Sequence, residues 1–359
     1  MEPWQSFKVR SLAAQDGAQL NALLRKYLRS YRGPEKWNWI FQRNPTGSRP
    51  EDGDVLVAET NSGEIIGCYS KLVYGMRFFG ESCLGAQGGG LIVDEGYRRL
   101  GVATELVKTS RANSAKRNFR VTFSFPNRLS QGISKKLQPV KEFPTKEVDL
   151  VLDEDRYLDL RYGDGLGRTI RSRLGSARAR VAASSGPLKF QITSGFSDDA
   201  GRVWESLRGR TDVGIERSLQ YLTWRYSKVW DDYSIISALD GGRTQGYVVS
   251  KIDGREGAQR LVICDLAAFD DNALAYRALL SAASAQAQST VSYITASASA
   301  TQGSTEALRQ FGFRSPPNPF FWMPGHGPTR LFAFSAAEAD KQKLRRATWH
   351  YAIGDRDTT

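Results

Sequence analysis

The sequence repeats one order of patterns after roughly 180 residues, and this repeat restricts the fold more than any other feature. Each copy has a short strand pattern, a helical spacing of apolar residues, an aromatic segment and a hairpin with a polar turn. These are residues 7–10, 20–27, 36–41 and 55–69 in the first copy, and residues 189–193, 200–207, 221–226 and 235–249 in the second. Because solenoids repeat every 20–50 residues or so, a repeat of this length indicates two copies of one domain.

Each copy then continues into a strand, a long helix and a second strand. The expected elements are residues 90–93, 101–116 and 120–124 in the first copy, and residues 260–264, 272–287 and 290–294 in the second. Hairpins followed by a strand–helix–strand unit predict an α/β fold with a mixed sheet and helices on both faces, present twice in tandem. The expected division is a domain at 1–155, a basic connector at 156–187, a second domain at 188–325 and a tail at 326–359 that packs on the domains.

The composition is that of a globular protein, with 40% hydrophobic and 25% charged residues among 359. No apolar run approaches the roughly 20 residues that span a bilayer, and the first residues lack the pattern of a secretory signal. We therefore expect a cytoplasmic protein. Cys68, Cys83 and Cys264 lie far apart in apolar stretches and predict buried thiols, and with only two histidines we expect no metal site.

The net charge of +12 calls for an anionic partner, which could be nucleic acid, anionic lipid or a phosphorylated cofactor. Motifs typical of nucleic-acid binding are missing from the sequence, which disfavours the first. Much of the excess charge lies between residues 161 and 180, which hold six arginines. We interpret this segment as a solvated connector; a surface that contacts a membrane or recruits polyphosphate is the alternative.

The turn between strand and helix in the first copy carries the clearest chemistry. The strand residues Leu91, Ile92 and Val93 lead through 94–97 into Arg98, Arg99, Leu100, Gly101, Val102, Ala103 and Thr104, where the helical pattern begins. Gly101 lets backbone approach a ligand closely, and the unpaired N–H groups of the first helical turn attract anions. Together with the two arginines, this turn predicts a cradle for a diphosphate.

The turn resembles the acyl-CoA loop of the GNAT N-acetyltransferase superfamily, whose pattern is Arg/Gln-x-x-Gly-x-Gly/Ala. Residues 125–127 and 133–137 are also similar to that family's Pro-Asn strand end and the helix that follows. The resemblance implies two GNAT-like domains in tandem and acetyl-CoA, or another acyl-CoA, as co-substrate. It implies that residues 91–93, 98–104 and Asn127 bind the coenzyme, with the backbone of 91–93 holding the pantetheine arm.

The resemblance is less complete at the residues that would finish the reaction. Ser134 stands where many members carry a tyrosine that protonates the departing thiolate, and Gln138 stands where they carry a glycine. Asp94 and Glu95 are the candidate bases, with Glu35 and Asp355 as looser ones. Trp37 and Trp39 predict core aromatics, or else a wall on which a sugar could stack.

The second copy has lost the cradle. Its corresponding turn, residues 267–272, has no Arg-x-x-Gly-x-Ala pattern and places Asp270 and Asp271 where a diphosphate would lie. Since like charges repel, we expect only the first copy to bind coenzyme A.

Three functions remain open at this point. The first is an acyl-CoA-dependent N- or O-acyltransferase that acts on a small amine or an amino sugar of bacterial surface-polysaccharide metabolism. The second is a Fem-like aminoacyltransferase, which takes its acyl group from a charged tRNA. The third is a scaffold that binds coenzyme A without catalysis. The sequence does not specify the oligomeric state.

Overall fold

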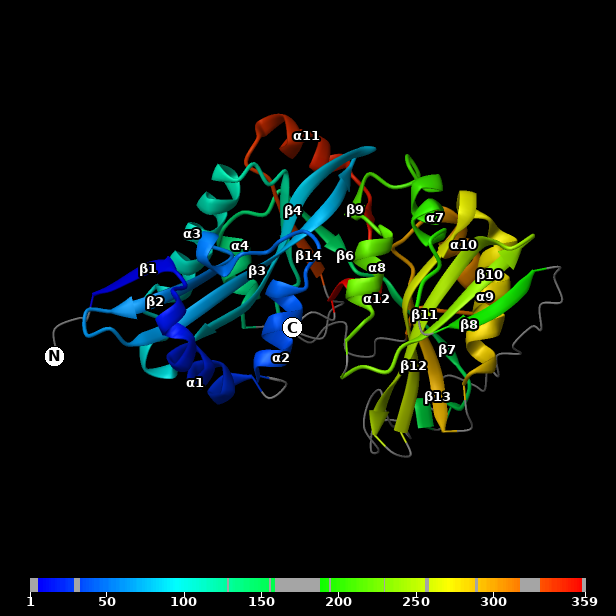
Figure 1. Ribbon diagram of the computed structural model, residues 1–359, viewed down its shortest axis with the longest axis horizontal. Helices are drawn as coiled ribbons and strands as arrows, with labels where there is room; N and C mark the ends of the chain where they lie inside the picture. Colours follow the sequence, from blue (N-terminus) through cyan, green and yellow to red (C-terminus); the bar gives the residue numbers. More distant parts are fainter. Residues whose placement is uncertain are drawn as a thin grey trace. The chain divides into compact units, whose positions relative to one another are not determined.

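The structure is a computed structural model. It describes residues 6–28, 33–127, 129–154, 156–158, 188–193, 195–228, 230–255, 258–287, 290–316 and 330–356. These residues form two compact units, and each unit is assembled from two stretches of the chain (Figure 1). The first unit holds the described parts of Met1–Pro144 and Thr329–Thr348, and the second those of Thr145–Pro328 and Trp349–Asp357.

The sheet of the first unit follows the order β1-β2-β3-β4-β5-β14-β6. Its strands are β1 Phe7–Ser11, β2 Val55–Thr60, β3 Ile65–Phe78, β4 Glu81–Val93, β5 Val121–Ser124, β14 Arg330–Phe334 and β6 Lys141–Pro144. All neighbouring pairs are antiparallel except β4 and β5, which are parallel. The sheet is therefore mixed, as the order of hairpins and strand–helix–strand unit predicts.

Helices cover both faces of this sheet. They are α1 Gly17–Tyr27, α2 Gly33–Trp37, α3 Val102–Lys116, α4 Gln131–Lys136 and α11 Glu338–Arg346. Alternation along β2 explains the two layers, because successive side chains of a strand point to opposite faces. Val55 and Val57 pack with the leucines of α1, whereas Leu56 and Ala58 pack with Val102 and Leu106 of α3.

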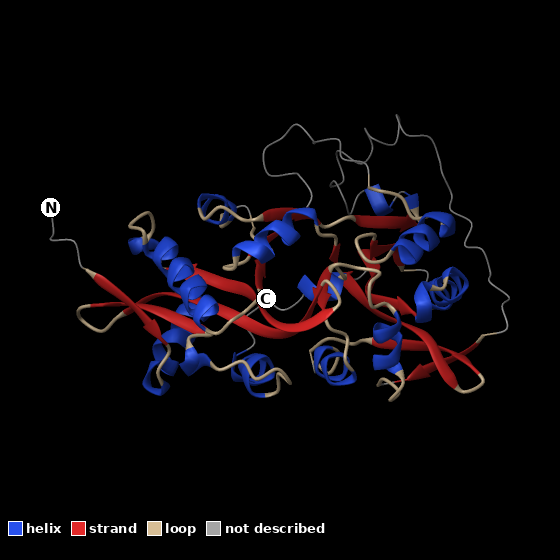
Figure 2. Ribbon diagram, turned by 90° about the horizontal axis from the view of Figure 1, so that it is seen from above, coloured by secondary structure: helices blue, strands red, loops and turns tan. Residues whose placement is uncertain are grey.

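The sheet of the second unit follows the order β7-β13-β12-β11-β10-β8 (Figure 1). Figure 2 draws strands in red and helices in blue. Its strands are β7 Glu147–Val151, β13 Val291–Ser297, β12 Ala258–Ala268, β11 Arg243–Arg255, β10 Ser234–Asp240 and β8 Lys189–Thr193, and a short parallel pair is formed by β9 Val213–Ile215 and β15 Trp349–His350. The helices are α7 Ala200–Ser206, α8 Leu219–Arg225, α9 Ala273–Ala285, α10 Gln302–Phe311 and α12 Ile353–Arg356. The core of this unit contains the apolar side of α9, with Leu279 and Leu280 fully buried.

Each of the two sheets contains one strand from outside the stretch of sequence that we expected to form its domain. β14 comes from the end of the sequence but lies between β5 and β6 in the first sheet. β7 lies within the segment 1–155 that we expected to be the first domain, yet it pairs with β13 in the second sheet. The repeat and the mixed sheets are confirmed, but the compact units do not follow the linear limits at residues 155, 188 and 325. Strands of five residues carry no local signal for the sheet they join, so the sequence patterns did not indicate these two placements.

The sequence also predicts a basic connector, buried thiols and no membrane-spanning segment. The arginines at 161–180 lie outside the described residues. Cys68 and Cys264 are buried thiols, as expected, whereas Cys83 is partly exposed. Among the described helices, none is both long and apolar enough to cross a membrane.

Candidate functional site

The turn that precedes α3 leaves the N-terminus of the helix without a side-chain cap. Gly101 occupies the capping position with φ of 87° and offers no side-chain cap, and Arg99 is also left-handed with φ of 65°. The N–H groups of Val102, Ala103 and Thr104 have no partner within the helix, because the first turn lacks preceding carbonyls. A Cβ added at Gly101 would meet nothing within 4 Å. The turn thus presents backbone donors and the positive end of the helix dipole to open space.

Arg98, Arg99 and Leu100 are exposed beside this turn. The Nε of Arg98 donates to the carbonyl of Val93 at 3.1 Å, and its guanidinium lies 5.2 Å from the centre of the Tyr27 ring. These contacts keep the cation of Arg98 beside the strand end. The predicted residues 91–93 and 98–104 therefore lie close together at the end of β4 and the start of α3, with Ile92 and Val102 buried in the core and Arg98 to Gly101 exposed.

Residues at the end of α1 hold the turn in place through hydrogen bonds to the carboxylate of Asp94. Lys26 Nζ donates to Asp94 Oδ2 at 2.9 Å, the Tyr27 hydroxyl donates to the same oxygen at 3.1 Å, and the Gly96 N–H donates to Oδ1 at 3.2 Å. The hydrogen bond from Lys26 is the main reason that the pKa of Asp94 lies below its usual range. Such a carboxylate is a weak base at neutral pH. Glu95 is exposed, and its carboxylate lies 4.0 Å from Lys26.

An opening lies between β4 and β5. The two strands pair only from Gly85 with Val121 to Gly88 with Ser124, and beyond Gly88 no described residue pairs with β4 on that side. On its other side, β4 carries a bulge, since Tyr69 lies between the Cys68–Ile92 and Ser70–Gly89 pairs. The unpaired edge from residue 89 to residue 93 leads directly to the turn before α3. A ligand chain could add to this edge as an extra strand does.

The glycines at 88–90 accommodate side chains of β3 that a larger residue would contact. Gly90 has φ of 61°, and a Cβ there would lie 2.9 Å from the hydroxyl oxygen of Ser70. A Cβ at Gly88 would lie only 1.8 Å from the hydroxyl oxygen of Tyr69. The side chain of Tyr69 therefore occupies part of the space beside these glycines. Neither a motif nor a periodicity marked Tyr69.

The residues after β5 form a turn and α4. Asn127 is exposed, and its Oδ1 accepts the N–H groups of Leu129 and Ser130 at 3.0 Å each. Ser134 is half-buried on α4. Gln138 follows the helix with φ of 52°, so the backbone keeps the left-handed conformation that glycine favours although the glycine is missing.

Trp37 and Trp39 lie in different environments. Trp39 is 2% exposed and belongs to the core, while the ring of Trp37 is half-buried with its centre 4.4 Å from that of Phe41. Glu35 is exposed on α2. Across the described ranges, no group of three or more His, Cys, Asp or Glu side chains is placed to hold a metal ion.

The corresponding turn of the second unit is closed. Asn272 precedes α9, and its Oδ1 accepts the N–H groups of Leu274 at 2.9 Å and Ala275 at 3.2 Å. Asp271 accepts the N–H of Gly303 at 2.9 Å. An asparagine cap and a carboxylate take the place of the open turn, in agreement with a second copy that has lost the cradle.

No family model matches the sequence, and no curated protein matches it either. Solved structures do match. A GCN5-related N-acetyltransferase from Anabaena variabilis aligns with a TM-score of 0.61 and 12% identity over 93% of this chain and 74% of its own. A probable N-acyltransferase from Enterococcus faecalis gives a TM-score of 0.58 and 12% identity over 95% and 74%. Saccharomyces cerevisiae N-myristoyltransferase with bound myristoyl-CoA gives 0.55 and 10% over 93% and 84%. This chain has the GNAT fold.

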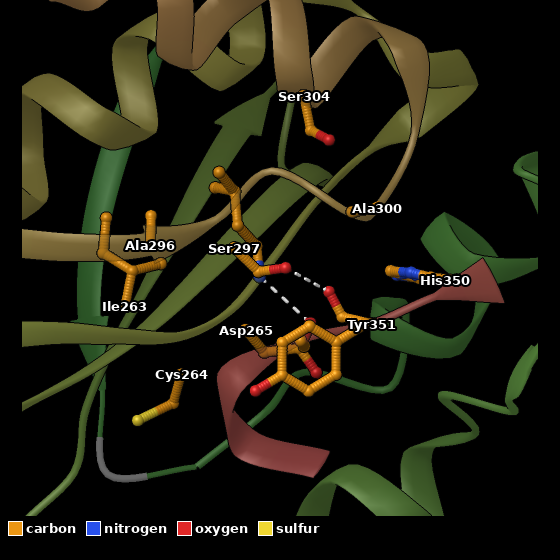
Figure 3. Close-up of a pocket in the computed structure, with 11 residues that line it drawn as sticks. Ile263, Cys264, Asp265, Ala296, Ser297, Ala300, Ser304, His350 and Tyr351 are labelled. Atoms are coloured by element: carbon orange, nitrogen blue, oxygen red, sulfur yellow. Dashed lines mark hydrogen bonds between the residues drawn. The ribbon is translucent and has the colours of Figure 1, made fainter. Parts of the chain in front are cut away.

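In the second GNAT-like unit, the opening between the parallel strands is filled by the chain itself. β12 pairs with β13 only from Gln259 to Val262, and the segment 349–355 enters the space beyond (Figure 3). The Tyr351 N–H donates to the Ser299 carbonyl at 2.7 Å, and the Ser297 hydroxyl donates to the Tyr351 carbonyl at 2.6 Å. The remaining space of about 10 Å³ is about the size of one water molecule. In the second unit, the segment 349–355 therefore occupies the position that corresponds to the unpaired edge of β4 in the first unit.

Buried charges hold this segment in place. Arg217 is fully buried, and its Nη2 lies 2.7 and 2.8 Å from the two carboxylate oxygens of Asp355. Its Nε lies 3.3 Å from Asp265 on β12. Asp355, one of the looser base candidates, thus belongs to a buried ion pair of the second unit.

Proposed function

We propose that this protein is an acyl-CoA-dependent N- or O-acyltransferase and that the first unit binds the acyl-CoA. The observation that carries the proposal is the open, side-chain-free turn at Gly101, placed at the end of a strand edge that lacks a partner. The N–H groups of this turn would bind the diphosphate, with Arg98 and Arg99 adding charge. The edge at residues 91–93 would hold the pantetheine arm. The fold shared with N-acetyltransferases supports the same conclusion.

The reaction that we propose is direct attack of an acceptor amine or hydroxyl on the thioester within a ternary complex, where proximity supplies much of the rate. Asp94 and Glu95 follow the end of β4 that adjoins the diphosphate cradle. Asp94 is six positions after Gly88, where β4 and β5 separate and where the thioester would lie, and six positions are roughly 20 Å along an extended strand. A proton would therefore reach either carboxylate only through water. Ser134 on α4 remains a candidate donor to the leaving thiolate.

We propose acetyl as the acyl group and a small amine or an amino sugar of bacterial surface-polysaccharide metabolism as the acceptor. A cytoplasmic location follows from the donor, because acyl-CoA thioesters are made inside cells. A Fem-like transferase that uses charged tRNA is the second candidate, and the net charge of +12 is the observation that favours it. A scaffold that binds coenzyme A without turnover is the third.

Calorimetry with acetyl-CoA tests the proposal. We expect micromolar binding by the wild-type chain and a loss of at least tenfold, about 1.4 kcal/mol, in Gly101→Glu. Gly209→Glu is a matched control, because Gly209 has φ of 81°, is exposed and has nothing within 4 Å of a Cβ, yet it lies in the second unit. Equal loss in both variants would indicate general damage and would contradict the site.

Two further outcomes separate the alternatives. Salt-sensitive binding of tRNA with no affinity for acetyl-CoA would support the Fem-like function instead. Tight acetyl-CoA binding without release of coenzyme A thiol across a broad panel of amines would support the scaffold.

A further inference from the structure

Tyr69 lies opposite the bulge of β4 and reaches across that strand. Its backbone faces Gly90 and Leu91, between the two flanking pairs of β3 and β4. Its hydroxyl reaches Gly88, where a Cβ would lie at only 1.8 Å. Gly88 is also the last residue of β4 that pairs with β5. The hydroxyl of Tyr69 is therefore located where the two strands separate.

This hydroxyl is available to a ligand. The side chain is half-buried against the apolar cluster beneath α3, which includes Val102 and Leu106. None of the described residues forms a hydrogen bond with the hydroxyl. The charge of Arg111 on α3 acts on Tyr69, and Arg111 is itself held by a hydrogen bond of 2.6 Å to the Leu137 carbonyl. Burial raises the pKa of Tyr69 to about 12, so the hydroxyl keeps its proton at neutral pH.

The distance from the cradle matches the length of the proposed ligand. Val93, at the end of the strand, is five positions after Gly88, and five positions are roughly 16 Å in an extended strand. An extended pantetheine arm has a similar length. With the diphosphate at Gly101 and the arm along the unpaired edge, the thioester would lie near Gly88.

We propose that Tyr69 is a catalytic residue whose hydroxyl donates a hydrogen bond to the thioester carbonyl oxygen of the bound acyl-CoA. This inference rests on the proposed function. The acceptor's lone pair forms a bond to the carbonyl carbon, and the carbonyl π electrons move to oxygen, where Tyr69 stabilises the developing negative charge. The electrons return as the carbon–sulfur bond breaks, and the thiolate of coenzyme A leaves. The acceptor gives up its proton to water, and Tyr69 keeps its own throughout.

The spectroscopic test uses acetyl-CoA labelled with ¹³C at the carbonyl carbon and needs no acceptor. A hydrogen bond from a phenol lowers the stretching frequency of the carbonyl. In the wild-type complex, we expect a shift to lower frequency relative to acetyl-CoA in water, and we expect this shift to be lost in Tyr69→Phe. Calorimetry on the same samples should show acetyl-CoA affinity that changes by less than about tenfold, because one neutral hydrogen bond is modest.

The proximity test uses thiol–disulfide exchange with the disulfide of coenzyme A. In a Cys83→Ser background, a thiol at position 69 would attack this disulfide, form a mixed disulfide and release one coenzyme A thiol. We expect Tyr69→Cys to react at least tenfold faster than Val9→Cys, as measured by mass spectrometry. Val9 is the matched control, because it is also half-buried in the same cluster but lies on β1.

The outcomes separate this inference from the proposed function. If the wild-type chain binds acetyl-CoA and both expected results appear, the role of Tyr69 is supported. If it binds but Tyr69→Phe leaves the carbonyl band unchanged, or Tyr69→Cys reacts no faster than Val9→Cys, the role of Tyr69 is refuted while the coenzyme site stands. If the wild-type chain does not bind acetyl-CoA, the proposed function is refuted, and the role of Tyr69 with it.

Discussion

The ion pair between Arg217 and Asp355 provides a strong test of how the second unit is stabilised. Arg217 is fully buried and Asp355 is 2% exposed, and the guanidinium contacts both carboxylate oxygens at 2.7 and 2.8 Å. The same carboxylate accepts the Ala352 N–H at 3.0 Å. Replacing Asp355 with alanine leaves a buried cation with Asp265 as its remaining carboxylate partner, and it leaves the Ala352 N–H unpaired. Breaking a buried pair in this way costs about 3–5 kcal/mol, a large part of a typical stability of about 5–15 kcal/mol.

Urea unfolding followed by tryptophan fluorescence measures this loss. Trp204 is a suitable probe, because its ring is stacked on His350 at 4.9 Å in the same unit. The control is Glu205→Ala, which breaks a half-exposed pair with Arg208 at 3.0 Å and should cost less than about 1 kcal/mol. A loss in Asp355→Ala no larger than that in Glu205→Ala would refute the idea that this pair anchors the segment 349–355.

Three further predictions concern single residues. Burial lowers the pKa of Lys71 to about 8 from 10.5, so the unfolded chain binds more protons at this residue between these values, and the contribution of Lys71 to stability should rise with pH by about 3 kcal/mol across that window. The free energy of unfolding of the wild type minus that of Lys71→Met should therefore rise from pH 7.5 to 10.5 in urea unfolding, and a difference that does not change with pH would contradict the assignment. Gln138→Gly should raise the melting temperature, because its φ of 52° costs a non-glycine residue about 1 kcal/mol; a lower melting temperature would show that the side chain matters more. Asn272→Ala should cost about 1 kcal/mol and speed hydrogen exchange at Leu274 and Ala275, and unchanged exchange would count against the cap.

The features that the sequence predicted well are local. The helix expected over 101–116 is α3, which spans Val102–Lys116, and the helix expected over 272–287 is α9, which spans Ala273–Ala285. Their starts could be recognised because Gly101 and Asn272 act on backbone within a few residues. The contrast between an open and a closed helix end was therefore predictable from two short segments.

The features that the sequence did not predict depend on contacts between distant residues. Tyr69 and Gly88 are nineteen positions apart, and their approach depends on one extra residue in the bulge of β4, which shifts the register of a long strand. Asp94 was a candidate base from the sequence, but its partners Lys26 and Tyr27 come from α1, far away in the chain. A carboxylate in sequence can serve as a base or as a structural anchor, and only its neighbours in space decide between these roles.

The two copies differ at both ends of the proposed coenzyme site. At each end, the second copy has backbone groups with hydrogen-bond partners where the first copy has unpaired ones. At the helix end, the second copy has the cap of Asn272 where the first has the bare turn of Gly101. At the strand end, it has the backbone of Tyr351 where the first has an unpaired edge. Satisfied backbone groups stabilise a fold, and unsatisfied ones leave donors for a ligand. A chain with one copy closed at both positions and the other open at both is what we expect if the first unit binds the ligand and the second serves the structure.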